Sequence, residues 1–169
     1  MSVVDPPPPP LRVAVVGSSA VDEDEYELAR SLGSELARRG VAVVCGGRGG
    51  VMEAVSFGAA SAGGLTVGIL PGRDGRGANP WVLLPLATGM GEGRNALVVR
   101  AAESVVAVGG SWGTLSEIAL ARKMGREVAL LGRPLMGGLE LPVFGDPEAA
   151  AAWAVERARV ARGEIPARR

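Results

Sequence analysis

The chain has 169 residues, 47% of them hydrophobic and only 4% aromatic, which suits one compact domain with a core of Val, Leu, Ala and Ile. Its 18 basic and 18 acidic residues cancel, so the basic surface that dominates nucleic-acid binding is absent, and we expect no nucleic-acid partner. The single cysteine, Cys45, excludes an internal disulfide, and the lack of histidine excludes the usual zinc and haem sites. We expect no metal and no cofactor.

The N-terminal region shows neither a signal peptide nor a membrane span. No stretch of the chain reaches the roughly 18 consecutive apolar residues that a span needs. We therefore expect a cytoplasmic protein with no membrane partner. Residues 1–10 include five consecutive prolines, which predict a flexible leader. The folded domain is predicted over residues 11–162, followed by a flexible tail over residues 163–169.

From residue 11 onward, short β-rich runs alternate with helical patterns. Asp22 followed by Glu25 resembles a capping box, and Asp146 followed by Pro147 is a helix-start signal. Strands are predicted over residues 11–16, 41–45, 65–70, 82–86, 104–108 and 127–131, and helices over residues 23–39, 51–62, 94–103, 114–124 and 147–159. This alternation predicts an α/β fold in which helices cover both faces of a parallel sheet.

Three glycine-rich turns each follow a predicted strand. The first contains Gly17 and Ser18, the second contains Gly47, Gly49 and Gly50, and the third contains Gly110, Ser111, Gly113 and Thr114. Carboxyl ends of parallel strands meet at one edge, so the backbone N–H groups of these turns can converge on one phosphate. Neither the dinucleotide fingerprint nor the Walker spacing is present. We therefore expect a mononucleotide or a sugar phosphate as the ligand.

Charged and aromatic side chains near these turns each allow two interpretations. Glu117 either caps the helix expected from Thr114, or acts as a general base or stabilises a cationic sugar. Arg94 either lies in solvent at a helix end, or clamps a phosphate or sugar hydroxyls. Asn95 is either a helix-start residue or a ligand donor. Trp112 either stacks on a base or packs against a neighbouring loop or subunit.

Two other features of the chain stay equally open. Arg48 lies among glycines, and it either contacts the phosphate of the ligand or makes no contact with the ligand. The glycine-rich and charged segment over residues 73–80 either folds over a ligand or simply connects two strands.

The third turn and the residues before it resemble a known family. The stretch from Gly109 to Glu117 is similar to the Pro-Gly-Gly-x-Gly-Thr-x-x-Glu motif of the Lonely Guy family and its relatives in the SLOG superfamily, which were once labelled lysine decarboxylases. Arg94 stands where that family has an arginine on the preceding helix, and residues 46–52 resemble its second glycine motif. The resemblance covers about residues 12–131. The wider group to which this family belongs also includes the DNA-processing A proteins.

The resemblance implies a modified Rossmann fold, usually as a homodimer, with the apolar run over residues 96–99 packing on a partner or on the sheet. It implies hydrolysis of the N-glycosidic bond of a nucleoside 5′-monophosphate to free base and ribose 5-phosphate. Glu117 would then activate water or stabilise the oxocarbenium-like sugar, and Arg94 would hold the ribose phosphate together with Gly113 and Thr114.

Three departures from the family motif place the chain closer to a divergent bacterial subgroup. Gly109 replaces the proline, Ser111 replaces a glycine, and Asn95 replaces the lysine that usually follows the arginine. This subgroup also resembles algal molybdenum-cofactor carrier proteins, which share the fold and bind a phosphorylated pterin without catalysis. The second hypothesis is therefore a binding or carrier protein, and the third, a DNA-binding relative, is weakened by the neutral charge.

Overall fold

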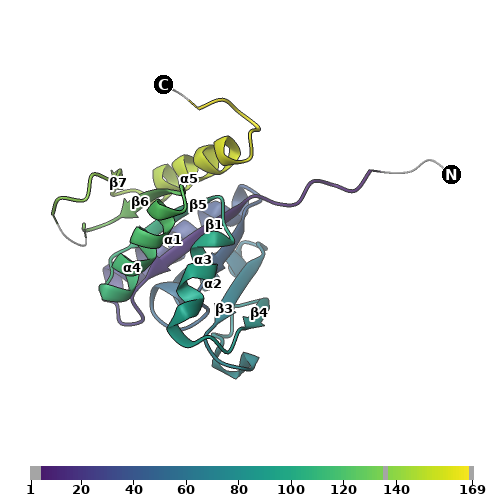
Figure 1. Ribbon diagram of the computed structural model, residues 1–169, viewed down its shortest axis with the longest axis vertical. Helices are drawn as coiled ribbons and strands as arrows, with labels where there is room; N and C mark the ends of the chain where they lie inside the picture. Colours follow the sequence, from purple (N-terminus) through teal and green to yellow (C-terminus); the bar gives the residue numbers. More distant parts are fainter. Residues whose placement is uncertain (1–4, 135–136, 168–169) are drawn as a thin grey trace.

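In the computed structural model, which describes residues 5–134 and 137–167, the core of the molecule is one parallel β-sheet (Figure 1). Its strands in the described residues are β1 (Arg12–Gly17), β2 (Ala42–Cys45), β3 (Thr66–Leu70), β4 (Leu84–Ala87), β5 (Ser104–Val108), β6 (Glu127–Leu131) and β7 (Val143–Phe144). They follow the order β4-β3-β2-β1-β5-β6-β7, and every pairing is parallel. The chain therefore reverses its direction of travel across the sheet between β1 and β5.

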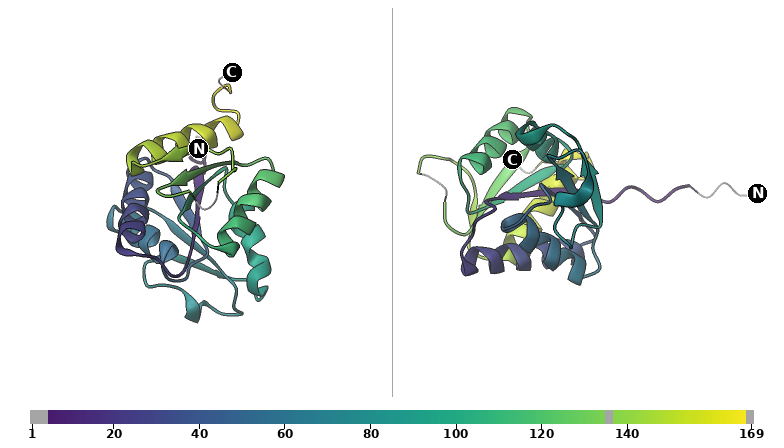
Figure 2. Two further views of the ribbon diagram at one scale, coloured as in Figure 1. Left: turned by 90° about the vertical axis from the view of Figure 1, so that its left-hand side faces the viewer. Right: turned by 90° about the horizontal axis from the view of Figure 1, so that it is seen from below.

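Helices cover both faces of this sheet, as the alternating pattern predicts (Figure 2). The helices are α1 (Glu23–Arg38), α2 (Val51–Ser61), α3 (Asn95–Arg100), α4 (Trp112–Lys123) and α5 (Pro147–Ala161). Helices α1, α2 and α5 pack on one face over Val13, Val43 and Val106. Helices α3 and α4 pack on the other face, and Val98 and Val99 of α3 are fully buried there. The apolar run over residues 96–99 thus packs on the sheet, and the prediction of a Rossmann-like α/β fold is confirmed.

The helix ends show which local signals were strong. Asp22 Oδ1 accepts a hydrogen bond of 2.8 Å from the Glu25 backbone N–H, as expected for a capping box. At α5, Asp146 Oδ2 accepts a bond of 3.0 Å from the Ala149 backbone N–H, and Pro147 is the first helical residue. At both helix starts, residues a few positions apart in the sequence supply the capping contact. Cys45 is fully buried at the end of β2.

Differences from the sequence-based prediction include the helix before β5 and the strands β4 and β7. The helix predicted over residues 94–103 is shorter, because a 3₁₀ turn, η2 (Gly91–Arg94), comes first and α3 ends at Arg100. Strand β4 begins two residues later and ends one residue later than predicted. Strand β7 was missed because it has only two residues, which is too short for an alternating pattern. None of these shifts changes the order of the sheet.

The start of β1 and the end of α5 are held together at the amino edge of the sheet. Glu103 accepts hydrogen bonds from the Arg12 backbone N–H at 2.6 Å and from Arg12 Nη2 at 2.6 Å. Arg162, just after α5, donates to the Pro9 carbonyl at 2.6 Å and to Glu103 Oε1. Residues 5–10 extend away from the domain (Figure 1), while residues 1–4 of the predicted leader and 168–169 of the predicted tail lie outside the described residues.

Candidate functional site

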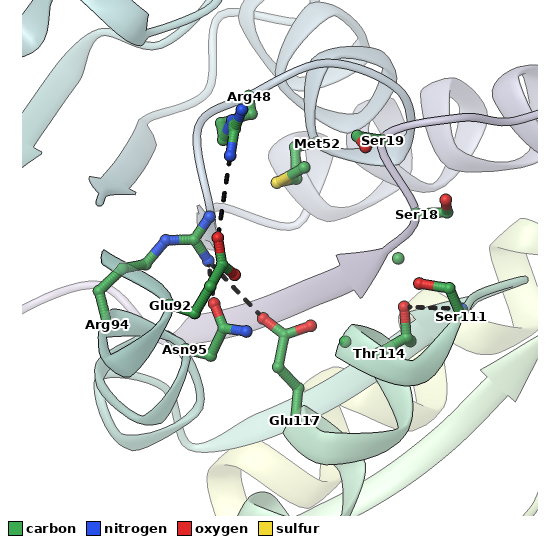
Figure 3. A pocket seen from close by; sticks show the side chains of 12 residues that line it. Ser18, Ser19, Arg48, Met52, Glu92, Arg94, Asn95, Ser111, Thr114 and Glu117 are labelled. Carbon is green, nitrogen blue, oxygen red and sulfur yellow. Dashed lines mark hydrogen bonds and ion pairs between the residues drawn. The ribbon is translucent and has the colours of Figure 1, made fainter. Parts of the chain in front are cut away.

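A cavity of about 170 Å³ opens at the carboxyl edge of the sheet, where β1 and β5 lie side by side. This is the point at which strand order reverses, and such points are the usual ligand sites of open α/β sheets. The cavity is lined by Gly17, Ser18, Ser19, Arg48, Met52, Glu92, Arg94, Asn95, Ser111, Gly113, Thr114 and Glu117 (Figure 3). These residues come from four segments that are far apart in the sequence.

The turn between β5 and α4 takes a conformation that depends on its glycines. Gly109 has a φ of 52° and Gly110 a φ of 138°, both in the region that side chains with a Cβ rarely adopt. Proline, whose ring fixes φ near −65°, cannot replace Gly109 in this turn. A Cβ at Gly109 would also lie 2.2 Å from Glu25 Oε1. Glycine is therefore required at position 109 for the turn as it stands in this structure.

Helix α4 begins earlier than the sequence predicted, and this changes the interpretation of Glu117. Ser111, not Thr114, is the N-cap residue, and the Ser111 backbone N–H donates to Thr114 Oγ1 at 3.4 Å. Glu117 therefore lies in the second turn of the helix, beyond the reach of the free N–H groups at its start. The capping role considered for Glu117 is wrong, and its carboxyl group instead lines the cavity.

Arg94 is the buried cation of the cavity, with a side chain only 5% exposed. Its Nη1 donates to Asn95 Oδ1 at 2.5 Å and lies 3.9 Å from Glu117 Oε1. A Cβ at Gly46 would lie 2.6 Å from Arg94 Nη2, so the missing side chain there leaves room for the guanidinium. The expectation of a solvated arginine at a helix end is wrong, because η2 turns Arg94 inward (Figure 3).

Glu117 has a buried carboxyl group whose pKa is raised above its usual value. Burial raises the pKa of Glu117 to about 7, although the Coulombic attraction of Arg94 lowers it and Glu92 raises it further. The 3.9 Å separation from Arg94 Nη1 is too long for a hydrogen bond, so the attraction offsets only part of the lost hydration. Burial also lowers the pKa of Arg94. At neutral pH Glu117 is present in both protonation states.

The structure brings together most of the residues singled out from the sequence, but not all. Those that line the cavity are Gly17, Ser18, Arg94, Asn95, Ser111, Gly113, Thr114 and Glu117. Gly47, Gly49, Gly50, Gly110 and Trp112 do not line it. At Gly50, with a φ of 64°, a Cβ would lie 2.3 Å from the Ser18 carbonyl oxygen, so this glycine serves the packing of two turns. Trp112 is 82% exposed at the start of α4.

Three residues of the cavity were missed in the sequence, namely Ser19, Met52 and Glu92. Glu92 lies two residues before Arg94, within the turn Gly91–Arg94, and this proximity to the predicted arginine was the available signal. Arg48, left open above, lies at the cavity with its Nη1 3.9 Å from Glu92 Oε1. Over residues 73–80, Asn79 Nδ2 donates to the Arg48 carbonyl at 2.9 Å, so this segment supports the second glycine turn.

Within residues 5–134 and 137–167, no group of three or more His, Cys, Asp or Glu side chains is placed to hold a metal ion. No helix in that part of the chain is long and apolar enough to cross a membrane.

The sheet order and the position of the cavity define a Rossmann-like α/β protein with its site at the reversal point of the sheet. Residues 10–157 match the model of the SLOG cluster4 family, and the chain belongs to this family. An uncharacterized protein of Archaeoglobus fulgidus is 39% identical over 146 residues, which cover 86% of this chain and 95% of the relative. The resemblance inferred from the glycine and glutamate motif is thereby confirmed.

Solved structures with the same fold include two proteins named for the molybdenum cofactor. The molybdenum cofactor binding protein of Rippkaea orientalis is similar with a TM-score of 0.82 and 32% identity, covering 88% of this chain and 97% of that one. The molybdenum cofactor carrier protein of Chlamydomonas reinhardtii gives a TM-score of 0.79 and 33% identity, covering 88% and 98%. DNA processing protein A from Helicobacter pylori, with a TM-score of 0.68 but 18% identity over 87% of this chain and 81% of that one, shares the fold alone.

Proposed function

We propose that this chain is a non-catalytic binding or carrier protein for a phosphorylated small molecule, and that its ligand is the molybdenum cofactor. The observation that carries the proposal is the buried guanidinium of Arg94 in the wall of the cavity. Its Nε has no hydrogen-bond partner among the described residues, so the cation is incompletely satisfied by the protein. A phosphate would supply the missing negative charge and hydrogen-bond acceptors.

The surroundings of Arg94 support the same ligand chemistry. Ser111, Gly113 and Thr114 line the cavity at the start of the 12-residue helix α4, where free backbone N–H groups and the helix dipole favour an anion. Asn95 takes the place of a lysine in the family motif and holds Arg94 through its side-chain oxygen, which a lysine cannot do. Arg94 and Asn95 together thus carry one positive charge, and the hydrogen bond from Arg94 to Asn95 fixes the orientation of the guanidinium.

The size of the cavity fits the phosphate end of a larger ligand. Pockets for whole ligands usually measure about 300–1,000 Å³. A second cavity of about 230 Å³ adjoins the first through Arg48, with Leu70, Pro71 and Asp74 in its wall. We infer that the phosphate occupies the first cavity and that the attached ring system extends toward the second. The named binding and carrier proteins with 32% and 33% identity support the molybdenum cofactor as this ligand.

The test is to produce the chain in a bacterial host that makes the cofactor and to measure molybdenum and released pterin in the purified protein. We expect both in a fixed ratio to the protein, and both lost in Arg94→Gln. Arg12→Gln, at the opposite edge of the sheet, is the matched control. Purified wild-type protein that carries neither, and that takes up none from a cofactor-loaded donor, would contradict the proposal.

A second candidate function is hydrolysis of a nucleoside 5′-monophosphate to base and ribose 5-phosphate, and one observation favours it. Glu117 is 6% exposed and has a pKa of about 7, which is suited to a general acid or base at neutral pH. The test is incubation with a panel of nucleoside 5′-monophosphates and detection of free base by chromatography. Release that disappears in Glu117→Gln supports this function, and binding without release supports the carrier.

The quaternary structure and cellular location stay predictions. The homodimer is an expectation from the family, and sedimentation analysis of the purified chain would test it. The expected absence of a nucleic-acid partner stays a prediction too, which a titration with single-stranded DNA would test.

A further inference from the structure

An exposed ion pair lies at the opening of the cavity. Arg48 Nη1, from the turn after β2, lies 3.9 Å from Glu92 Oε1, from the turn η2 (Figure 3). The side chain of Arg48 is 54% exposed and that of Glu92 is 78% exposed. Both residues line the cavity that contains Arg94 and Glu117. The pair therefore connects two walls of the site near solvent.

The turn that carries Glu92 is anchored by its backbone. The Gly91 N–H donates to the Pro71 carbonyl at 3.0 Å, and the Gly93 N–H donates to the Met90 carbonyl at 3.1 Å. The same four-residue turn, Gly91–Arg94, ends in the buried cation of the cavity. One short element thus holds both a cation for an anionic ligand and a carboxylate that repels it.

The charges around the opening act on the buried pair. Glu92 raises the pKa values of both Arg94 and Glu117, and Arg48 lowers the pKa of Arg94. A phosphate near Arg94 would therefore be attracted by Arg48 and repelled by Glu92. An exposed ion pair at 3.9 Å is weak in water, so Arg48 can exchange the carboxylate for a phosphate at little cost.

We propose that Glu92 sets the affinity of the site by competing with the phosphate of the ligand for Arg48. In the free protein Glu92 holds Arg48 at the opening of the cavity. When a phosphate monoester binds, Arg48 contacts its oxygens and Glu92 is left in solvent. The site then binds less tightly than two unopposed arginines would, which favours release of the ligand. This inference rests on the proposed binding of a phosphorylated molecule.

The experiment measures the dissociation constant of ribose 5-phosphate by titration at low ionic strength, with ribose as the probe without phosphate. We expect Glu92→Gln to bind ribose 5-phosphate about three- to ten-fold more tightly than the wild type, and this gain to shrink at high salt. We expect Arg48→Gln to bind more weakly. In the double variant, the gain from removing Glu92 should be clearly smaller, because only the direct repulsion between Glu92 and the phosphate remains.

Glu127→Gln is the matched control, because Glu127 also forms an exposed pair with an arginine, Arg122, at 3.1 Å. It begins β6 and so lies at the opposite edge of the sheet, and it should leave affinity unchanged. An unchanged affinity in Glu92→Gln, or an equal gain with and without Arg48, overturns this proposal while binding by the wild type preserves the proposed function. If neither the wild type nor Glu92→Gln binds ribose 5-phosphate, this proposal fails, and the measurement of bound molybdenum and pterin then decides the proposed function on its own.

Discussion

Two glutamates at opposite edges of the sheet are buried to the same extent, but their pKa values shift in opposite directions. Glu103 at the amino edge and Glu117 at the carboxyl edge are each 6% exposed. Burial alone would raise both pKa values. At Glu103 the hydrogen bonds from the Arg12 side chain and backbone overcome that effect, and its pKa lies below the usual value. At Glu117 burial prevails, and its pKa is about 7.

The geometry of the arginine partners explains the difference. Glu103 accepts three hydrogen bonds from Arg12, at 2.6, 3.1 and 2.6 Å, and lies within 3.3 Å of Arg162 Nη2. Arg94 instead directs Nη1 to Asn95, and Glu117 lies 3.9 Å away. At the amino edge, the carboxylate of Glu103 is thus paired with arginines of the protein itself. The carboxyl edge leaves an arginine and a carboxyl group incompletely paired, which is the condition for a ligand to bind there.

The largest effects should come from removing the charge of each glutamate. At pH 8, Glu103→Gln should lower the free energy of unfolding by about 2–3 kcal/mol, because charged hydrogen bonds are lost. Glu117→Gln should raise it by up to about 3 kcal/mol, because the wild-type carboxyl group must ionise in a buried site. Urea unfolding of both variants checks this, and equal signs for the two changes would contradict the comparison.

The pH dependence of these effects follows from the signs of the shifts. A raised pKa means that the stability contributed by Glu117 is complete below its usual pKa and is lost as pH rises through 7. The advantage of Glu117→Gln should therefore grow between pH 5 and pH 8. A lowered pKa means that the stability contributed by Glu103 is lost as pH falls. The cost of Glu103→Gln should therefore shrink in acid.

Exchanging the arginines separates binding from stability. Arg94→Gln should weaken binding of ribose 5-phosphate about 100-fold, since a buried charged contact to the phosphate is lost. Arg12→Gln should leave that affinity unchanged while lowering the midpoint of thermal unfolding. Isothermal titration and a thermal melt of both variants check this pair. An Arg94→Gln protein that binds as well as the wild type would show that the phosphate lies elsewhere.

The protonation of Glu117 should also appear in anion binding. Sulfate stays doubly charged across neutral pH, so a change in its affinity reports on the protein. We expect sulfate to bind about ten-fold more weakly at pH 8.5 than at pH 6, because the ionised carboxylate of Glu117 repels it. Glu117→Gln should flatten this dependence, whereas Glu103→Gln should not. A profile that is flat in the wild type would place the anion away from Glu117.

The smallest effect is expected at Trp112. Its side chain is 82% exposed and does not line the cavity. Trp112→Ala should therefore change the affinity for a nucleoside 5′-monophosphate by less than about two-fold, the size of a typical surface substitution. Asn95→Ala, which removes the acceptor that orients Arg94, is the contrasting variant and should weaken binding more. A larger loss in Trp112→Ala would restore the stacking hypothesis.

The sequence by itself determined the α/β alternation, the parallel sheet, the helix starts at Asp22 and Asp146, and the family motif from Gly109 to Glu117. Each of these depends on side-chain periodicity or on contacts between residues a few positions apart. It also identified Arg94 and Glu117, but as residues with two open interpretations.

The tertiary structure alone decided between those interpretations. Because α4 begins at Trp112, Glu117 lies in its second turn and cannot cap it. The turn η2 places the Arg94 side chain inside the cavity, next to Gly46. Burial of Glu117 and its distance from Arg94 set its pKa, and both depend on elements far apart in the chain. The ion pair of Arg48 and Glu92 likewise connects two turns that are separated by two strands in the sequence. Such contacts leave no periodic signal in the sequence, because protonation and charge balance depend on how the folded chain excludes water.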